Sequence, residues 1–296
     1  MHVFITGSSG LIGHELVQML QQAGHRVTRL VRRPATSGEE RQWDSTARHL
    51  SPALLEGCDV LVHLAGERIA PGRWTKHRKA LIFQSRVETT RQLAETIGQM
   101  EHPPRAFVVA SAVGYYGDAG ETLLTESSPS GHNFLAEVCT AWEAAADPVR
   151  SLTRVAHVRT GMVLSEKGGA LRPMLIPFKL GLGGVIGSGQ QYWSWITLRD
   201  IARLFVFVIE NESARGPVNG VAPHPVSAAE FTASLGKRCH RPTLLPMPAF
   251  VARMAIGEMA DDLILASTRV EPAAALAWGF EFADPELQAA LAGLPL

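Results

Sequence analysis

Hydrophobic residues in the first 160 positions fall into short runs, separated by longer stretches in which apolar residues recur with helical spacing. Five of these runs are predicted to be strands, at residues 3–6, 26–31, 59–63, 106–110 and 154–159. The runs are mostly apolar, as expected for strands that are buried on both faces. Strands that alternate with helices in this way are typical of βαβ units. The pattern therefore predicts an α/β fold with a Rossmann-like, doubly wound parallel sheet.

Four helices are predicted between and after these strands, at residues 11–23, 74–100, 134–146 and 198–210. The first is expected to end at Gly24, because glycine readily adopts the left-handed conformation that often follows a helix. Residues 165–190 are rich in glycine, which predicts a long loop that moves or binds a ligand. Trp193 and Trp195 follow it and are expected either to pack in the core or to stack on a ligand. Two or three further helices are expected after Pro223.

Composition and charge exclude several classes of function. The 296 residues suffice for one large α/β domain with a smaller additional domain. Lys and Arg together number 28, as do Asp and Glu, so no net charge attracts nucleic acid or anionic lipid. No stretch approaches the roughly 18 apolar residues of a membrane span, and the first residues lack the features of an export signal. We therefore expect a cytoplasmic protein without nucleic-acid or membrane partners.

The three cysteines give no sign of a metal or redox centre. Cys58, Cys139 and Cys239 lie far apart in the sequence, and none belongs to a C-x-x-C pair. Zinc and dithiol chemistry need closely spaced ligands. We expect free thiols and no metal site.

The strongest local signal is a glycine-rich loop that directly follows the first predicted strand and opens the first helix. In residues 6–13, Gly7 permits a tight turn, Gly10 lets the backbone approach a pyrophosphate, and Gly13 allows the helix to pack closely on the strand. The alternative, a purely structural turn, is disfavoured by this position in a five-strand alternation. A dinucleotide site is predicted, with an anion at the helix N-terminus. The expected contacts are Gly7, Ser9, Gly10, Leu11, Ile12 and Gly13.

The end of the second predicted strand indicates which dinucleotide binds. An acidic residue there would favour NAD, because a carboxylate binds the ribose hydroxyl. This chain has Arg32 and Arg33 instead, and a guanidinium pairs bidentately with a phosphate. We therefore predict NADP(H) in preference to NAD(H). The alternative is that both arginines are solvated surface charges.

Small residues follow the third predicted strand, where a loop would lie against the cofactor. Leu64, Ala65 and Gly66 are expected to contact it, and Gly161 is included among the expected contacts. His63 is interpreted as a histidine at a strand end rather than as an acid or base.

After residue 165 the sequence changes from alternating strand and helix patterns to a glycine-rich stretch. This change predicts two structural units that are interleaved along the chain. Residues 1–165 are expected to form the NADP-binding Rossmann domain, with residues 190–212 returning to it. Residues 166–189 and 213–296 are expected to form a smaller C-terminal α/β domain that binds substrate or acts as a lid.

With these motifs and the run at 111–117, the chain resembles the extended short-chain dehydrogenases/reductases. It is most similar to an atypical branch, the NAD-dependent epimerase/dehydratase family proteins of unknown substrate, which carry a small C-terminal domain of their own. The matching segments are residues 85–90, 112–117, 142–143, 180–184, 219–223, 257–260, 269–270 and 279–280. Membership does not fix the reaction, because one fold hosts many chemistries.

The resemblance implies a Tyr-x-x-x-Lys catalytic pair on the helix at 134–146, but Leu135 and Cys139 stand at those two positions. The family's asparagine on the preceding helix is replaced by Arg86, which is expected to hold a cofactor phosphate or an anionic substrate. Ser111 is a candidate for polarising a substrate carbonyl and for contacting the cofactor. Tyr116 and Cys139 are the other catalytic candidates, although packing is an alternative for the phenol and an inert buried thiol for the cysteine.

Two functions therefore remain open. The first is an NADP-dependent oxidoreductase or nucleotide-sugar epimerase-like enzyme that acts on an unknown small molecule. The second is a non-catalytic protein that senses NADPH and acts through a protein partner. A homodimer is compatible with both, and a structural subunit without cofactor is disfavoured by the complete glycine loop and by Arg32.

Overall fold

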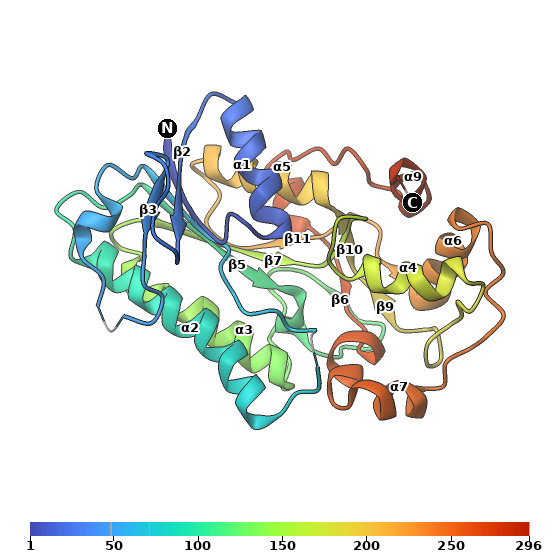
Figure 1. Ribbon diagram of the computed structural model, residues 1–296. Helices are drawn as coiled ribbons and strands as arrows, with labels where there is room; N and C mark the ends of the chain where they lie inside the picture. Colours follow the sequence, from blue (N-terminus) through green and yellow to red (C-terminus); the bar gives the residue numbers. More distant parts are fainter. Residues whose placement is uncertain (48, 71, 296) are drawn as a thin grey trace.

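The computed structural model describes residues 1–47, 49–70 and 72–295 (Figure 1). It is built around a sheet of seven strands in the order β11-β7-β5-β4-β1-β2-β3, and every neighbouring pair is parallel. The strands are β1 (His2–Thr6), β2 (Arg26–Val31), β3 (Glu40–Gln42), β4 (Val60–His63), β5 (Ala106–Ala112), β7 (Arg154–Thr160) and β11 (Gly216–Gly220). The strand order reverses between β1 and β4, as in doubly wound sheets. The predicted Rossmann-like fold is confirmed.

Helices cover both faces of the sheet. Figure 1 shows α1 and α5 above it, and α2 and α3 below it. The helices are α1 (Leu11–Gln22), α2 (Lys76–Gly98), α3 (Phe134–Ala144), α4 (Leu171–Lys179), α5 (Leu198–Glu210), α6 (Ala228–Arg238), α7 (Ala249–Ile256), α8 (Ala273–Ala277) and α9 (Leu287–Gly293). Short turns of 3₁₀-helix lie at Pro52–Leu55, Val113–Tyr116 and Asp147–Val149, and one π-helical turn at Asp261–Leu265.

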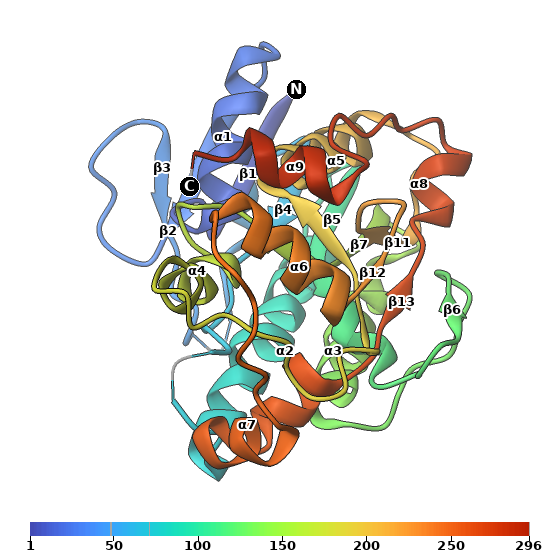
Figure 2. The same ribbon diagram turned by 90° about the vertical axis from the view of Figure 1, so that its right-hand side faces the viewer.

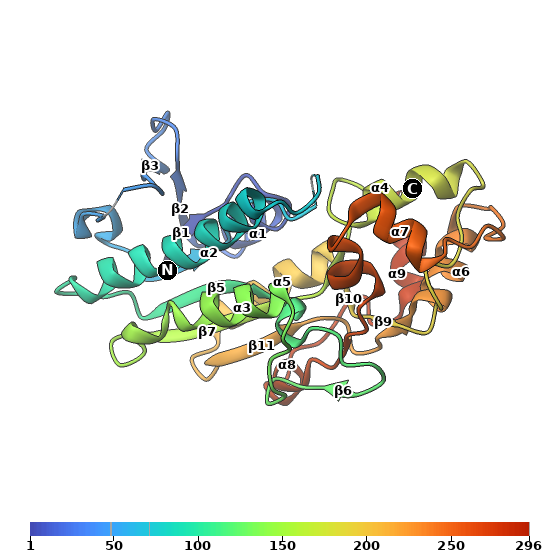
Figure 3. The ribbon, with the colours of Figure 1, turned by 90° about the horizontal axis from the view of Figure 1, so that it is seen from below.

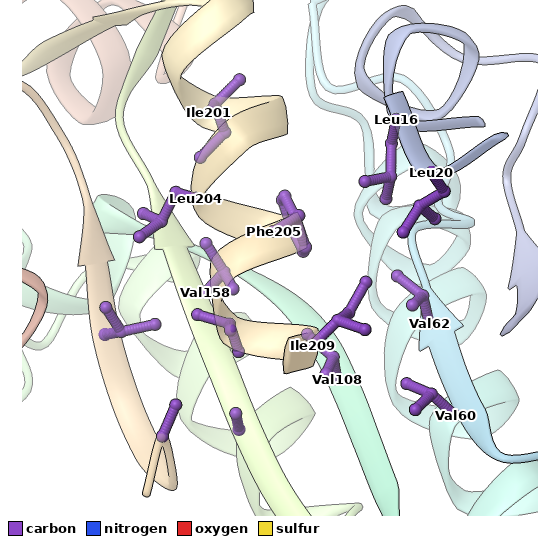
Figure 4. Packing of buried hydrophobic residues seen from close by; sticks show 14 of the residues in the cluster. Leu16, Leu20, Val60, Val62, Val108, Val158, Ile201, Leu204, Phe205 and Ile209 are labelled. Atoms are coloured by element: carbon purple, nitrogen blue, oxygen red, sulfur yellow. The ribbon is translucent and has the colours of Figure 1, made fainter. Parts of the chain in front are cut away.

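Helix α5 and helix α1 share one apolar core with the sheet. Figure 4 shows the α5 side chains directed at the strands, with Leu16 and Leu20 of α1 beside them. The α5 residues are Ile201, Leu204, Phe205 and Ile209, and the sheet residues include Val60, Val62, Val108 and Val158. Full burial of one such side chain contributes about 1.5–3 kcal/mol to folding. This packing holds α1, and with it the loop that precedes α1, in a fixed position on the sheet.

The C-terminal elements gather at one end of the molecule. Figures 2 and 3 show α4, α6, α7 and α9 together there, and Figure 1 shows that the arrow of β5 points toward this end. Three small sheets connect them to the rest: β8 (Met162–Leu164) with β10 (Trp195–Thr197), β9 (Tyr192–Trp193) with β12 (Val226–Ser227), and β6 (Leu123–Leu124) with β13 (Arg269–Val270). Ligands of open α/β sheets bind at the carboxyl ends of the strands, so this is the end where a site is expected.

All five predicted strands and all four predicted helices are present, but two strands of the sheet were not predicted. Strand β3 has only three residues, which are polar, and it lies at the sheet edge. Strand β11 contains Gly216 and Pro217, residues that usually interrupt strands, and it occupies the opposite edge, where such residues are tolerated. Residues 216–220 thus belong to the sheet rather than to the predicted C-terminal region.

The glycine-rich stretch is not a continuous loop, because it contains helix α4. Leu171, Leu175 and Phe178 form the buried face of that helix, while Pro177 lies within it and obscures the helical pattern in the sequence. Within the described residues, four α-helices follow Pro223 instead of two or three. Trp193 and Trp195 are buried in the core, as in the first of their two predicted alternatives. Among the described residues, no helix combines the length and the apolar character needed to cross a membrane.

Candidate functional site

The glycine loop between β1 and α1 has the shape that a close ligand approach requires. Gly7 has a φ of 70°, and a Cβ on it would lie 2.6 Å from the carbonyl carbon of Leu64. A Cβ on Gly13 would lie 2.2 Å from the Gly7 carbonyl oxygen. Both positions therefore need glycine, the first for its backbone conformation and both for space.

The N-terminus of α1 is suited to an anion. Gly10 is its N-cap and supplies no side chain to cap the helix. In the described part of the chain, the backbone amides of Leu11 and Ile12 donate no hydrogen bond. Unpaired amides together with the helix dipole attract a phosphate. The Leu11 side chain itself is directed elsewhere, because it lies against Gly168 and Gly169.

A cleft of about 1370 Å³ lies beside this loop. It is larger than the roughly 300–1,000 Å³ of pockets for drug-sized ligands, which leaves room for a dinucleotide. The predicted cofactor residues that line it are Gly7, Ser9, Gly10, Arg32, Arg33, Leu64, Ala65 and Gly66. The predicted residues outside its wall are Leu11, Ile12, Gly13, Arg86, Ser111 and Gly161. Gly161 lies against Ser194 and Val221, where a side chain would not fit.

One polar face of α2 also lines the cleft, and this face was not predicted. It includes Gln84, Ser85, Glu88, Thr89, Arg91 and Gln92. Their spacing of three and four residues is the one available signal, since such positions share a helix face.

The two arginines at the end of β2 differ in their surroundings. Arg33 donates two hydrogen bonds to the carboxylate of Glu40, at 2.7 and 2.8 Å, and Arg29 lies 3.6 Å from the same carboxylate. The bonds from Arg33, followed by one from the Thr36 amide, lower the pKa of Glu40 to about 2. Arg32 is exposed and belongs to no ion pair between described residues. Arg32 is therefore available to a ligand at the end of β2.

His63 connects three elements beneath the cleft. Its Nδ1 lies 2.6 Å from the Thr6 hydroxyl, and its Nε2 lies 3.1 Å from the Thr89 hydroxyl. Thr6 also accepts a hydrogen bond from the amide of Ala65 at 3.3 Å. Complete burial, and then the charge of Arg86, lowers the pKa of His63 to about 3. The imidazole is neutral near pH 7 and holds the loop after β4 to β1.

A buried polar cluster lies at the carboxyl ends of β5 and β7. One carboxylate oxygen of Glu143, on α3, accepts hydrogen bonds from the Ser111 hydroxyl at 2.7 Å and from Arg159 Nε at 2.8 Å. The other accepts from Arg159 Nη2 at 2.8 Å. Burial opposes the charge of Arg159, but its bonds to Glu143 raise its pKa above the ordinary value. The Ser111 hydroxyl is thus engaged within the protein.

Tyr116 belongs to the same cluster. Its hydroxyl donates to Asn219 Oδ1 at 2.7 Å and accepts from Arg159 Nη1 at 3.0 Å. Burial raises its pKa to about 12, so the phenol stays protonated. The guanidinium of Arg159 also lies 3.4 Å from the ring centre of Tyr115. Glu143 and Arg159 were not predicted to join a site; a charged residue at the end of an apolar strand was the signal for Arg159.

Helix α3 carries an apolar side chain and a thiol at the positions of the family's catalytic pair. Leu135 is buried against Trp74 and Met259, and its amide lies 3.3 Å from Asp262 Oδ2. Cys139 is 3% exposed. Burial, and then the nearby carboxylate of Glu143, raises its pKa to about 11. This is the environment of an unreactive thiol.

Comparison with known proteins places the chain in a family. The NAD dependent epimerase/dehydratase family matches residues 3–219. The chain belongs to this family. A domain of unknown function, DUF1731, matches residues 247–294, which agrees with the predicted small C-terminal part of an atypical branch.

Relatives from distant organisms match over nearly the whole chain. The epimerase family protein Mb2239 of Mycobacterium bovis is 41% identical over 281 residues, which cover 95% of this chain and 93% of that protein. The human epimerase family protein SDR39U1 is 38% identical over 294 residues, with 98% of both chains covered. A crystal structure of human SDR39U1 (isoform 2) with NADPH has a TM-score of 0.90 at 37% identity, and 99% of each chain is covered.

More distant structures share the fold alone. One is MoeE5 in complex with UDP-glucuronic acid and NAD, with a TM-score of 0.79 at 20% identity over 99% of this chain and 97% of that one. Solved structures with this fold therefore include complexes with either dinucleotide. The preference of this chain has to be argued from its own residues.

Proposed function

We propose that this protein binds NADP(H) in preference to NAD(H) and uses it in oxidoreductase or epimerase-type chemistry on a small molecule. The observation that carries the proposal is the exposed Arg32 at the end of β2, which borders the cleft and makes no ion pair with a described residue. A guanidinium binds phosphate, whereas a ribose hydroxyl is usually bound by a carboxylate. The solved complex of human SDR39U1 with NADPH supports the same choice.

Residues of the cleft and of the N-terminus of α1 beside it fit separate parts of such a cofactor. The free amides of Leu11 and Ile12 would bind its diphosphate, and Arg32 its 2′-phosphate. Residues 64–66, held in place by the hydrogen bond to Thr6, would lie against it. When bound, NADPH supplies a hydride, and the chain's own residues orient it.

A second candidate function is NADPH sensing without turnover, through a protein partner. It is favoured by the surroundings of Ser111, Tyr116 and Cys139, which are all buried among protein groups. A proton donor with a pKa near neutral is typical of general acid catalysis, and the pKa values of Tyr116 and Cys139 are raised to about 12 and 11. An enzyme would consume NADPH when offered a panel of aldehydes, ketones and sugar nucleotides, whereas a sensor would only bind it.

The proposed cofactor preference is tested with Arg32→Ala. Loss of one charged hydrogen-bonding group to a phosphate weakens binding by about 1 to 3 kcal/mol. We expect this loss for NADPH and almost none for NADH, measured by calorimetric titration at fixed salt. Arg215→Ala removes an exposed arginine outside the cleft and serves as the control. Equal losses for both nucleotides, or no loss for either, would rule out a 2′-phosphate contact by Arg32.

A further inference from the structure

Arg86 is a buried cation that forms no ion pair with a described residue. It lies on α2 and is 8% exposed. A charged group taken out of water costs several kcal/mol unless it is paired. No ion pair between described residues includes it, whereas the buried Arg159 has Glu143 as its partner. The guanidinium of Arg86 therefore lacks the charge compensation that the other buried arginine has.

The groups that accept hydrogen bonds from Arg86 are neutral, and the nearby carboxylate of Glu67, which attracts its charge, is already paired with Arg78 at 2.8 Å. Its guanidinium donates to the carbonyl oxygens of Ile82 at 3.1 Å and Glu67 at 3.0 Å, and to the Ser85 hydroxyl at 3.5 Å. Its Cζ lies 5.2 Å from the ring centre of Trp142, a weaker cation–π contact. These groups satisfy some of the N–H donors, but none of them forms an ion pair with the guanidinium.

The nearby thiol does not supply the charge either. Cys139 interacts with Arg86 electrostatically, but burial raises the pKa of the thiol to about 11, so it is neutral near pH 7. Burial also lowers the pKa of Arg86 itself, which reflects the cost of keeping the charge there. A ligand anion would remove that cost.

Arg86 lies close to the loop that follows β4, at the carboxyl edge of the sheet. A Cβ on Gly66 would lie 3.3 Å from Cζ of Arg86, so the guanidinium lies directly behind the loop that lines the cleft. Its Nε makes no hydrogen bond to a described residue and is not completely buried. At least one donor is therefore available to a ligand.

We propose that Arg86 binds an oxyanion of the substrate, so that the small molecule recognised by this protein carries a carboxylate or a phosphate group. This inference rests on the proposed NADP(H) site, because that site already has its own groups for the phosphates of the cofactor. These are the N-terminus of α1 and the side chain of Arg32. Arg86 lies on a different helix, α2, and interacts electrostatically with Cys139, whose thiol in turn interacts with Ser111 at the end of β5.

The first experiment titrates the NADPH-saturated protein with inorganic phosphate and with acetate, against chloride at equal ionic strength. We expect at least one oxyanion to raise the melting temperature of the wild type. In Arg86→Met the apparent affinity for that anion should fall by about tenfold or more. Arg215→Met, with an exposed arginine outside the cleft, should behave as the wild type. If no oxyanion stabilises the wild type, or if both variants respond alike, the inference is wrong.

The second experiment separates binding from a structural role. Replacing an uncompensated buried charge by an apolar side chain of similar size is often neutral or stabilising. Ligand-free Arg86→Met should therefore melt at the same temperature as the wild type or higher, and Arg86→Lys should retain part of the anion response. A lower melting temperature of both variants, with the anion response unchanged, would assign Arg86 a structural role.

A third arm distinguishes the source of the anion. If Arg86 binds the substrate, Arg86→Met should bind NADPH with nearly wild-type affinity. A loss for NADPH and NADH alike would mean that Arg86 binds the cofactor diphosphate, which contradicts a substrate anion. Failure of the wild type to bind NADPH at all would instead overturn the proposed function, so the two failures are distinguishable.

Discussion

Single residues at the edge of the sheet decide what the cleft can bind. Arg32 and Arg33 are adjacent in the sequence, yet Glu40 pairs with Arg33 and Arg29, and no ion pair between described residues includes Arg32. The glycine loop is equally specific, because Gly7 and Gly13 leave no room for a Cβ. The sequence predicted these glycines from their spacing. It did not predict Glu40, whose role depends on the folding of the loop between β2 and β3.

Gly13→Ala tests the glycine loop. The added Cβ would lie 2.2 Å from the Gly7 carbonyl oxygen, so the turn must shift. We expect the free energy of unfolding to fall by about 1–3 kcal/mol and NADPH affinity to fall with it. Gly38→Ala, where a Cβ meets no atom within 4 Å, is the matched control. Denaturant unfolding and NADPH titration measure both effects, and wild-type values for Gly13→Ala would contradict the described turn.

The reactivity of the cysteines tests the environment of Cys139. Cys58 and Cys139 are buried, with pKa values raised to about 12 and 11, whereas Cys239 is partly exposed. A disulfide reagent at pH 8 should therefore modify one thiol quickly in the native protein and three after unfolding. Cys239→Ser should remove the fast reaction. Rapid modification of Cys139 in the native protein would instead favour a nucleophilic thiol.

At the scale of helices and strands, most of the fold could be predicted from the sequence. The long-range contacts that build the candidate site could not. Five buried strands and four helices follow from local periodicity. Helix α4 and strands β3 and β11 did not, because proline, glycine or short polar sequence hides their pattern. The Glu143–Arg159 pair joins α3 to β7 across the sheet edge, and no local pattern indicates that contact.

Glu143→Gln tests how this pair holds the elements together. The substitution leaves Arg159 buried without a carboxylate, so the free energy of unfolding should fall by about 3–5 kcal/mol. Glu137→Gln, an exposed position on the same helix, is the control and should change stability little. A double variant with both Glu143 and Arg159 replaced by Leu should recover part of the loss. A stability of Glu143→Gln equal to wild type would contradict the buried pair.

The whole molecule combines a doubly wound sheet with a smaller set of C-terminal elements at its carboxyl edge (Figure 3). Two neutral histidines lie inside this sheet and affect its stability as a whole. Burial is the main cause that lowers the pKa of His63 to about 3 and of His157 to about 4, from the ordinary 6.5. The folded state therefore binds fewer protons than the unfolded state below pH 6.5.

Acid should consequently destabilise the protein. The stabilisation from the two histidines is complete above pH 6.5 and is lost as the pH falls toward 4 and then 3. The slope should approach about 1.4 kcal/mol per pH unit for each histidine. Glu40 adds to this loss only below its ordinary pKa of 4.5. Urea unfolding between pH 7 and 4.5 measures the slope, which His157→Gln should reduce; a flat profile would contradict two buried neutral histidines.

The central claim is that this cleft binds NADP(H) in preference to NAD(H). Calorimetric titration of the wild-type protein with NADPH and with NADH, at one salt concentration, tests it most directly. With Arg32 available for the 2′-phosphate, NADPH should bind at one site per chain and at least about tenfold more tightly than NADH. Equal affinities, tighter binding of NADH, or no binding of either nucleotide would contradict the account.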